Sequence, residues 1–391
     1  MERAPDVIVV GLGAMGSATL EALARRGKRV LGVDRFHPPH ASGSSHGGSR
    51  VIRLSYFEHP DYVPLLRSAY EGFDRLSLAC GERLRHETGL VVGGAPGNST
   101  TAGMLRSARE HGLEVDAIDG RELVRRHPQF AVPAEWEVVT ERRGGFVRPE
   151  ATVGAALALA RRFGAEIEFG AAVSSWGADG SNAWIEVEGR RREASALVLC
   201  AGAWMPALLA DLGVQLAPTR ETIVWLSDEG DPSWSAGNHP EAMPVWLFDR
   251  GQKPAVYGVP AFEGMGAPQG LKVGLHGRGP RVQPDGISDP VDEQIVAETV
   301  DATAERVRGA ASRRVVAVKH CLYTMSPDAD FVVGLHPRHS NVAIAGGFSG
   351  HGFKFAPVMG EVLADLATEG STRHPIGFLS PSRPNMHPNS P

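Results

Sequence analysis

The stretch DVIVVGLGAMGSATLEALARRGKRVLGVD, from Asp6 to Asp34, decides the fold of this chain. The apolar run Val7 to Val10 predicts a buried strand, and Val30 to Val33 predict a second one. Between them, Leu20, Leu23 and Ala24 recur with the spacing that places apolar side chains on one face of a helix. The stretch therefore predicts a strand, a tight turn, a helix and a second strand.

Three glycines, Gly11, Gly13 and Gly16, lie where the first strand meets the helix. In a dinucleotide-binding unit, the first permits the tight turn, the second lets the backbone approach a pyrophosphate, and the third lets the helix pack closely on the strand. The helix N-terminus offers free N–H groups to the anion. Asp34 follows Gly11 by 34 − 11 = 23 residues, where a carboxylate accepts hydrogen bonds from a ribose diol. The pattern predicts a dinucleotide site and leaves FAD and NAD equally open.

Composition excludes several classes of protein. The 391 residues allow a large core and two or three domain-sized bodies, and a formal charge of −5 gives no general attraction to nucleic acid or anionic lipid. No apolar run reaches the roughly 20 residues that cross a bilayer, and residues 1–5 do not resemble the start of an export signal. The three cysteines, Cys80, Cys200 and Cys321, form no CxxC pair, so we expect no disulfide framework, no metal site and a cytoplasmic location.

Periodicity and turn residues divide the rest of the chain into elements. Residues 35–61 are rich in Gly, Ser, Pro and His and predict a long loop, and residues 136–147 predict a hairpin that turns at 143–145. We expect helices at about 62–80, 101–111, 120–127, 151–163, 291–307 and 357–366. We expect strands at about 89–94, 166–169, 171–176, 183–187, 196–200, 221–226, 245–248, 255–259, 271–275, 315–318 and 342–345.

Four further segments, together with the glycine-rich turn, carry a family resemblance. They read PPHASGSSHGGSRVIR (38–53), GLKVGLHGRG (270–279), CLYTMSPDADFVVG (321–334) and GGFSGHGFKFAP (346–357). In this order the chain resembles the monomeric sarcosine oxidase and N-methyltryptophan oxidase family. The resemblance implies a flavoenzyme that holds FAD covalently through a cysteine and uses O2 to oxidise a secondary amine of an amino acid to an imine, with release of hydrogen peroxide.

The resemblance also implies the fold class, an α/β chain (α+β overall) whose Rossmann-like FAD-binding domain carries an inserted, mostly antiparallel substrate domain. We expect residues 1–90, 150–218 and 315–391 to form the FAD-binding domain. Residues 91–149 and 219–314 would form the substrate domain. As partners we expect a small amine and O2, no nucleic acid and no membrane, and we expect the chain to act as a monomer.

For the cofactor, the resemblance implies that Cys321 bonds the flavin ring. A thioether there would alter the electronics of the flavin and prevent its loss. The alternative for a free cysteine is a buried apolar thiol, which we expect for Cys80 and Cys200. The other positions implied to contact FAD are Gly11, Gly13, Ala14, Met15, Gly16, Asp34, Arg35, Ser44, Val173, Gly202, Trp204, Gly347, Gly350, Gly352 and Lys354.

For the substrate, the resemblance implies that Arg53 and Lys354 grip a carboxylate. An Arg fork binds a carboxylate through two hydrogen bonds and Lys adds a point charge, whereas a surface cation is the alternative reading of each. Lys272 matches the residue credited with activating O2, because a fixed positive charge stabilises the superoxide formed by the first electron transfer. We expect transfer of a hydride equivalent from the carbon beside a neutral amine.

The resemblance assigns further residues to the flavin and the substrate pocket. His46 and Arg50 would lie near the flavin ring, where Arg50 stabilises the reduced anionic form. The remaining positions implied to line the substrate pocket are His276, Tyr257 and Tyr323. Apart from the resemblance, Trp246 could line a roomier pocket suited to a bulky N-methyl amino acid. Packing in the core is an alternative for the tyrosines and for Trp246, and a structural histidine is an alternative for His276.

Three departures from the family pattern leave the substrate open. Ser45 and Gly48 stand where the family usually has a histidine and an aspartate, and residues 261–270 form a longer segment than usual. The alternatives are oxidation of a cyclic imino acid, a sugar-amine adduct or a biosynthetic intermediate, a flavin dehydrogenase that uses another acceptor, and a flavin- or nucleotide-binding module without catalysis.

Overall fold

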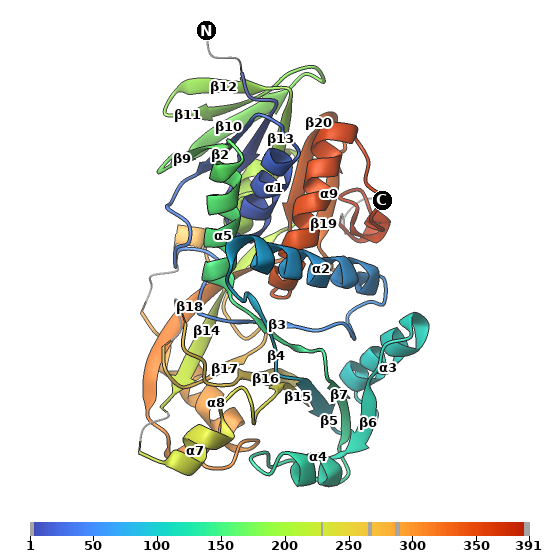
Figure 1. Cartoon of the computed structure of the whole chain (residues 1–391), viewed down its shortest axis with the longest axis vertical. Helices are drawn as coiled ribbons and strands as arrows, with labels where there is room; N and C mark the ends of the chain where they lie inside the picture. Colours follow the sequence, from blue (N-terminus) through green and yellow to red (C-terminus); the bar gives the residue numbers. More distant parts are fainter. Residues whose placement is uncertain (1–3, 228–229, 265–267, 286–289, 387–391) are drawn as a thin grey trace.

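A twisted six-stranded sheet forms the upper body of the molecule (Figure 1). The computed structural model describes residues 4–227, 230–264, 268–285 and 290–386. Neighbouring strands in this sheet are parallel except β19, which runs antiparallel to β20. In sheet order the strands are β19 (Val332–His336), β20 (His339–Gly346), β13 (Ala196–Leu199), β1 (Val7–Val10), β2 (Val30–Asp34) and β9 (Glu166–Phe169).

Both faces of this sheet are covered, as its continuous apolar strands require. Val7 and Val9 of β1 pack in the core beneath the helices, whereas Ile8 and Val10 pack on the other side, where a three-stranded sheet lies. The helices are α1 (Ala14–Arg25), α2 (Tyr62–Cys80), α5 (Pro149–Arg162) and α9 (Ala356–Glu369). The three-stranded sheet consists of β10 (Val173–Ala178), β11 (Ala183–Val187) and β12 (Arg190–Ala194).

The glycine-rich turn has the close packing that its residues predict. Gly11 has φ +86°, a conformation that favours glycine, and a Cβ there would lie 2.7 Å from Cα of Ala201. A Cβ on Gly16 would overlap the carbonyl oxygen of Gly11. The first turn of α1 can therefore rest directly on the end of β1 only because both positions lack a side chain.

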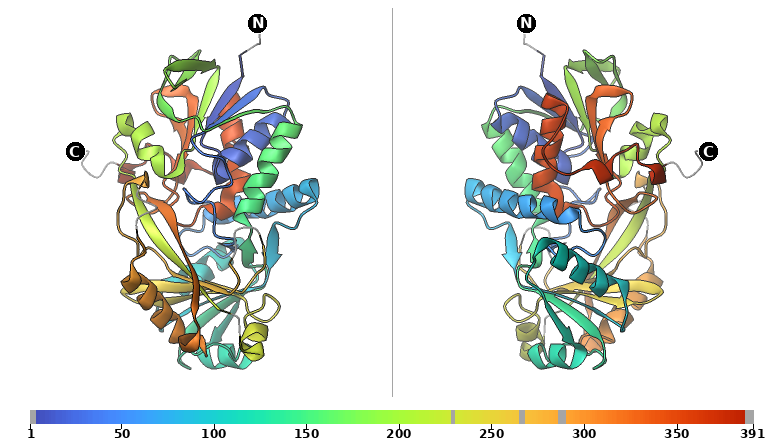
Figure 2. Two further views of the ribbon diagram at one scale, coloured as in Figure 1. Left: turned by 90° about the vertical axis from the view of Figure 1, so that its left-hand side faces the viewer. Right: turned by 90° about the vertical axis from the view of Figure 1, so that its right-hand side faces the viewer.

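An eight-stranded sheet forms the lower body, and only its β15–β5 pair is parallel. In sheet order the strands are β18 (Val315–Met325), β14 (Ala217–Leu226), β17 (Leu271–Leu275), β16 (Lys253–Val259), β15 (Val245–Arg250), β5 (Leu90–Gly94), β7 (Glu137–Glu141) and β6 (Asp116–Asp119). The long strands β14 and β18 pair along their length and rise from this sheet toward the upper body (Figure 2).

The remaining elements are short. The other helices are α3 (Ser99–His111), α4 (Gly120–Arg126), α6 (Met205–Leu208), α7 (Pro232–Gly237) and α8 (Glu293–Ala304). Single turns of 3-10 helix span Gly202–Trp204, Ala210–Leu212, Ala310–Ser312, Phe353–Phe355, Gly377–Leu379 and Pro384–Met386. A third antiparallel sheet joins β3 (Arg50–Ile52), β8 (Gly145–Val147) and β4 (Arg85–Glu87). Within the described ranges, none of these helices is long and apolar enough to cross a bilayer.

The structure confirms the α/β fold class and most of the expected elements. The strands expected at 7–10, 166–169, 183–187 and 271–275 and the helix expected at 62–80 have the bounds of β1, β9, β11, β17 and α2. The strand expected at 315–318 continues to Met325, so Cys321 lies on β18. β18 is hydrogen-bonded to β14 in the eight-stranded sheet.

The prediction of a hairpin at 136–147 is wrong. β7 pairs with β5 and β6, whereas β8 pairs with β3 and β4 in another sheet. The glycines at 144 and 145 do not close a hairpin but let the chain cross closely between the sheets, since a Cβ on Gly145 would overlap the carbonyl oxygen of His86. The strands β3, β4, β6 and β12, which are short or polar, were not expected either, and neither was β19, although its residues Val332–His336 are mostly apolar and buried.

The packing of Gly16 yields a prediction about stability. Gly16→Ala should destabilise the protein by about 1–3 kcal/mol or more, because the added methyl overlaps the backbone of Gly11. Gly154→Ala is the matched control, since it also lies inside a helix, α5, but has nothing within 4 Å of the new Cβ. That control should be neutral or stabilising by up to about 1 kcal/mol. Urea unfolding measures both, and equal stability of the two variants would contradict the packing described.

Candidate active site

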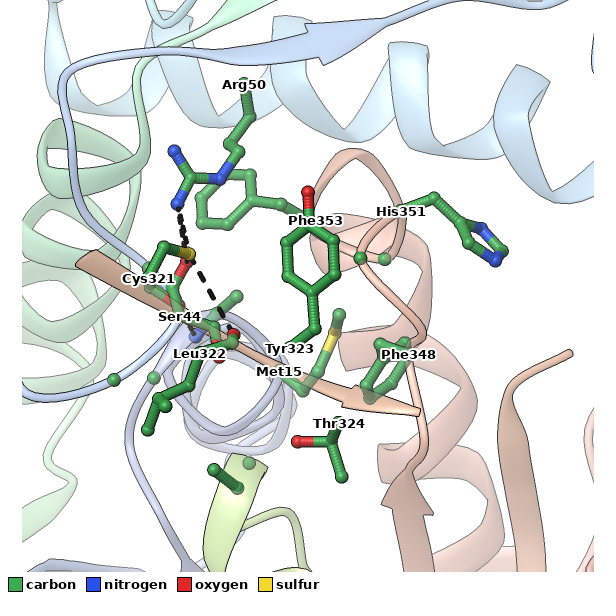
Figure 3. Close-up of a pocket in the computed structure, with 18 of the residues that line it drawn as sticks. Met15, Ser44, Arg50, Cys321, Leu322, Tyr323, Thr324, Phe348, His351 and Phe353 are labelled. Atoms are coloured by element: carbon green, nitrogen blue, oxygen red, sulfur yellow. Dashed lines mark hydrogen bonds between the residues drawn. The ribbon is translucent and has the colours of Figure 1, made fainter. Parts of the chain in front are cut away.

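A large cavity lies between the carboxyl ends of the upper parallel strands and one face of the lower sheet. Its lining comes from the turn after β1, the loop after β2, the eight-stranded sheet and residues 347–354. Figure 3 shows part of it, with Arg50 of one segment and Cys321 and Tyr323 of another projecting toward the same space. A doubly wound sheet binds its ligands at this edge, so the position matches the expected one.

Strand register brings distant residues of the lower sheet onto the cavity face. In the paired strands, Lys272 lies between Trp225 and Val259, and Glu221 lies opposite Cys321. Side chains two apart on a strand share a face, so Tyr323 lies on the same side as Cys321. One face of the sheet therefore presents the predicted lysine and the predicted cysteine together.

The upper end of the cavity has the features of a dinucleotide cradle. Asp34 accepts hydrogen bonds from N–H of Leu12 at 2.6 Å and N–H of Phe36 at 2.7 Å, and burial raises the pKa of its carboxyl group. At the start of α1, Ser45 Oγ accepts a hydrogen bond from N–H of Ala14 at 3.2 Å. A Cβ on Gly13 would meet only Ser45 Oγ, at 3.5 Å, so the backbone there is open to a ligand. These residues fit FAD.

Cys321 is 2% exposed and its sulfur faces a guanidinium group. Arg50 Nη2 donates to Cys321 Sγ at 3.1 Å and to the carbonyl oxygen of Ser44 at 2.8 Å (Figure 3). Arg50 Nη1 also donates to the carbonyl oxygen of Ser49 at 2.9 Å. A positive charge is thus fixed beside the sulfur by backbone carbonyls.

Lys272 is buried, and carbonyl groups rather than carboxylates hold its ammonium group. Lys272 Nζ donates to the carbonyl oxygens of Gly47 at 3.0 Å and Ser49 at 2.6 Å, and it contacts Ser49 Oγ at 3.3 Å. Burial, and next the charge of Arg50, hold the pKa of Lys272 well below its usual range. Because the charge of Lys272 is costly to bury, an anion that enters the cavity would strongly favour its charged form.

Arg53 and Lys354 lie together at another side of the cavity, and Arg53 already has a carboxylate partner. Arg53 Nη2 donates to both oxygens of Glu58, at 2.8 and 2.6 Å. Burial opposes the ionisation of Glu58, yet Arg53 and neighbouring cations lower its pKa to about 2. Lys354 Nζ donates to the carbonyl oxygen of His351 at 2.7 Å, and burial and then Arg53 lower its pKa to about 7.

Between these cations lie aromatic side chains. Tyr323 Oη is 3.4 Å from Nδ1 of His276, which follows β17 directly, and burial lowers the pKa of His276. A Cβ on Gly274 would lie 2.7 Å from Oη of Tyr257, and one on Gly350 would overlap the ring of Tyr323. Two glycines thus make room for the two tyrosine rings.

Most of the residues that the sequence assigned to the site line this cavity. Besides those described above, they include Met15, Arg35, Ser44, Val173, Gly202, Trp204, Gly347 and Gly352. Gly16 and His46 do not line it. His46 is buried, neither ring nitrogen has a hydrogen-bond partner in the described part of the chain, and burial followed by the charge of Arg50 lowers its pKa to about 3.

Trp246 borders the cavity, but its ring belongs to the core on the other face of the sheet. It stacks on Phe248 at a centroid distance of 5.3 Å and lies over Gly258, whose Cβ would overlap the indole. Alternation along β15 places Leu247 toward the cavity instead. Of the two readings weighed for Trp246, the structure therefore favours sheet packing.

Sequence reasoning missed the carboxylates that hold the backbone before and after β3. Glu150 accepts from N–H of Gly47 at 2.6 Å and also from N–H of Gly48. Glu141 accepts from N–H of Leu54 at 2.7 Å and N–H of Ser55 at 2.8 Å. Gly48, one of the departures, has φ +76°, which suits glycine better than aspartate. The segment 261–270 includes residues 265–267, which lie outside the described ranges.

The cavity also contains two polar residues that the sequence did not single out. Glu221 accepts from Thr219 Oγ1 at 2.7 Å and N–H of Gly279 at 3.0 Å, and burial raises its pKa. His351 lies within the motif GGFSGHGFKFAP, which could have drawn attention to it. Within the described residues, no group of three or more His, Cys, Asp or Glu side chains has the arrangement of a metal site.

Comparisons with known proteins agree with this geometry. The family described as "DAO: FAD dependent oxidoreductase" matches residues 6–366. The chain is 39% identical to a monomeric sarcosine oxidase of Streptomyces avermitilis, over 97% of each chain. It is 33% identical to an N-methyl-L-tryptophan oxidase of Salmonella heidelberg, over 93% of this chain and 94% of the relative.

Solved structures show the same fold. NikD, whose description is an unusual amino acid oxidase essential for nikkomycin biosynthesis, superposes with a TM-score of 0.82 over 97% of this chain and 98% of its own, at 22% identity. The family match covers both bodies of the molecule and the turn, loop and strand residues that line the cavity. The chain therefore belongs to the FAD dependent oxidoreductase family, with full-length relatives among the monomeric sarcosine oxidases and N-methyl-L-tryptophan oxidases.

Proposed function

We propose that this protein oxidises the secondary amine of an N-methyl amino acid, such as sarcosine or N-methyltryptophan. O2 is the acceptor, and the products are an imine and hydrogen peroxide; water then converts the imine to the amino acid and formaldehyde. The observation that carries the proposal is the cavity itself, which joins a dinucleotide cradle to a buried Arg53–Lys354 pair across an aromatic pocket. The names of the two curated relatives quoted above support the same reaction.

When bound, FAD would supply the two-electron acceptor for a hydride from the carbon beside the amine nitrogen, and O2 would take up these electrons. Gly11, Gly13 and the N-terminus of α1 would hold its pyrophosphate, and Asp34 would hold the adenosine ribose. Cys321 would bond the flavin ring. Arg50, fixed 3.1 Å from the sulfur, would place positive charge where the reduced cofactor is negative.

A substrate carboxylate would bind Arg53 and Lys354. Because Glu58 occupies the guanidinium fork, the substrate has to displace this carboxylate or share Arg53 with it. Lys354 has no carboxylate contact among the described residues, and an entering carboxylate would favour its charged form. If the substrate carboxylate displaced Glu58, Arg53 would still have one carboxylate partner, and Lys354 would gain a negative charge beside it.

The charges around the pocket also select the protonation state of the amine. Arg53, Lys272 and Lys354 are buried around the same cavity, and Arg50 is half-buried there. Burial and like charges both disfavour an ammonium ion, so the substrate would bind with a neutral nitrogen and a free lone pair. No side chain then has to remove a proton from nitrogen before the carbon–hydrogen bond breaks.

Three further expectations accompany the reaction. We propose that residues 1–90, 150–218 and 315–391 form the FAD-binding domain, and that residues 91–149 and 219–314 form the substrate domain. We also propose that the enzyme works as a monomer in the cytoplasm. The substrates of other enzymes on this scaffold, a cyclic imino acid or a sugar-amine adduct among them, are the alternatives that the following screen decides.

An anaerobic screen of flavin reduction tests the function. We expect N-methyl amino acids to reduce the flavin fast, and matched amines without the carboxylate to reduce it far more weakly. Arg53→Met should raise the apparent dissociation constant about 100-fold for the amino acids and much less for the carboxylate-free amines, which serve as the control. No reduction by any N-methyl amino acid, with rapid reduction by another amine class, would overturn the proposal.

Lys272 is predicted to act on reoxidation. Lys272→Met should leave anaerobic flavin reduction within a few-fold of the original rate but slow reoxidation by O2 about 100-fold, since the variant loses a fixed charge beside the oxygen site. Lys319→Met is the control, because Lys319 also lies 5.7 Å from the ring of Trp225 but does not line the cavity. Stopped-flow spectroscopy measures both steps, and unchanged reoxidation in Lys272→Met would refute the role.

Covalent attachment is tested by acid precipitation of the holoenzyme. Yellow colour should stay with the protein pellet, and Cys321→Ala should release it into the supernatant. Cys200→Ala should retain the colour, because Cys200 is a second buried thiol that lines the cavity but contacts the backbone of Val10 and Gly11. Flavin released from the unaltered protein, or retained in Cys321→Ala, would contradict the attachment.

A further inference from the structure

Tyr56 touches both cations of the proposed carboxylate site without lining the cavity. The side chain is fully buried. The Arg53 guanidinium carbon lies 4.1 Å from the centroid of the Tyr56 ring, and Lys354 Nζ lies 3.4 Å from its hydroxyl oxygen. A single residue behind the pocket wall thus contacts one cation with its ring face and the other with its oxygen.

The hydrogen bonds around Tyr56 have a defined direction. His351 Nε2 lies 3.0 Å from the carbonyl oxygen of Ala329, which can only accept, so Nε2 carries the proton. Nδ1 of the neutral ring is then an acceptor, and the Tyr56 hydroxyl, 2.5 Å away, donates to it. With its only proton committed to His351, the Tyr56 oxygen presents lone pairs to Lys354, whose ammonium group donates.

The surroundings of His351 preserve this direction of the hydrogen bonds. Burial lowers the pKa of His351 to about 3; the nearby carboxylate of Glu58 raises it, and the nearby ammonium of Lys354 lowers it. The imidazole therefore stays neutral in the range in which the enzyme would work. The backbone of Tyr56 is held as well, because Ser107 Oγ donates to its carbonyl oxygen.

We propose that Tyr56, oriented by His351, is the positioning residue of the carboxylate site. Its ring fixes the plane of Arg53, and its oxygen holds the ammonium of Lys354 in place and in the charged form. The inference rests on the proposed function of Arg53 and Lys354 as the carboxylate grip.

Loss of the Tyr56 hydroxyl oxygen should lower the pKa of Lys354. The groups that face Lys354 are Arg53, which disfavours its charge, Glu58, which favours it, and His276, Tyr56 and His351, which are neutral. Removing an acceptor of its hydrogen bond destabilises the ammonium form and lowers the pKa of Lys354 further below about 7. Binding of a carboxylate should then weaken and be lost at lower pH.

The experiment titrates the holoenzyme with acetate between mildly acid and mildly alkaline pH and follows the flavin absorption spectrum, with acetamide as the uncharged probe. Tyr56→Phe keeps the ring over Arg53 and removes only the oxygen. Tyr62→Phe is the matched control, because Tyr62 is buried 4.9 Å from Tyr56, ring to ring, but its hydroxyl binds Asp330 at 2.9 Å and contacts neither cation.

In Tyr56→Phe we expect acetate to bind roughly five- to tenfold more weakly. The midpoint of its loss at alkaline pH should move down by about half to one pH unit. With an N-methyl amino acid, KM should rise by a similar factor while the limiting rate of flavin reduction stays within about twofold. Tyr62→Phe should match the original protein in all three measurements.

A second variant tests the direction of the hydrogen bonds. His351→Leu removes the acceptor of the Tyr56 proton, so the hydroxyl can turn toward Lys354 and repel its ammonium group. The same downward shift in pH should appear. If acetate binding depended on pH in Tyr56→Phe and His351→Leu as it does in Tyr62→Phe, the inference would be overturned. If Arg53→Met bound acetate as tightly as the original protein, the proposed carboxylate grip would be overturned instead.

Discussion

Buried positive charge is the constraint on which the rest of the site depends. Arg50, Arg53, Lys272 and Lys354 surround the cavity, and among the described residues only Glu58 forms an ion pair with any of them. Such charges are costly to bury, and the lowered pKa values of both lysines express that cost. Backbone carbonyls offset part of it at Lys272 and Lys354. The larger compensation would come from anions that the cavity admits: the reduced flavin, reduced oxygen and a substrate carboxylate.

The fold supplies these charges from segments far apart in the chain. The lower sheet brings Lys272 and Cys321 onto one face through the register of β14, β17 and β18. β3 and the residue after it bring Arg50 and Arg53 over that face, and two buried carboxylates, Glu141 and Glu150, hold the backbone on either side of β3. These carboxylates bind backbone N–H groups and form no ion pair with the cations, although the charge of Glu150 favours the charged forms of Arg50 and Lys272. A rigid frame with unbalanced charge inside is thereby compatible with a stable protein.

Much of this arrangement could be predicted from the sequence, and the remainder depends on contacts that no local pattern records. Spacing alone predicted the strand, turn and helix around Gly11 and Gly16. The hydrophobic periodicity and the close backbone packing that requires glycine both involve residues that are near one another in the sequence. Family motifs predicted which cations and which cysteine meet in the cavity. The partner of Gly47, Glu150, lies 103 residues away and has the sequence context of an ordinary first-turn acid. The ion pair between Glu58 and Arg53 lies in a segment whose sequence has no regular periodicity. The hairpin expected at 136–147 was wrong because β7 and β8, before and after the glycine turn, pair with strands of two different sheets.

If the cations around the cavity hold the reduced flavin in its anionic form, this shows in the pH dependence of the two-electron reduction potential. In mildly acidic buffer, flavin free in water is reduced with uptake of two protons, whereas an anionic reduced form takes up one. Because a tenfold change in a two-electron equilibrium corresponds to about 30 mV, we expect a slope of about −30 mV per pH unit in the holoenzyme. A slope of about −59 mV per pH unit would mean a neutral reduced flavin and would contradict it.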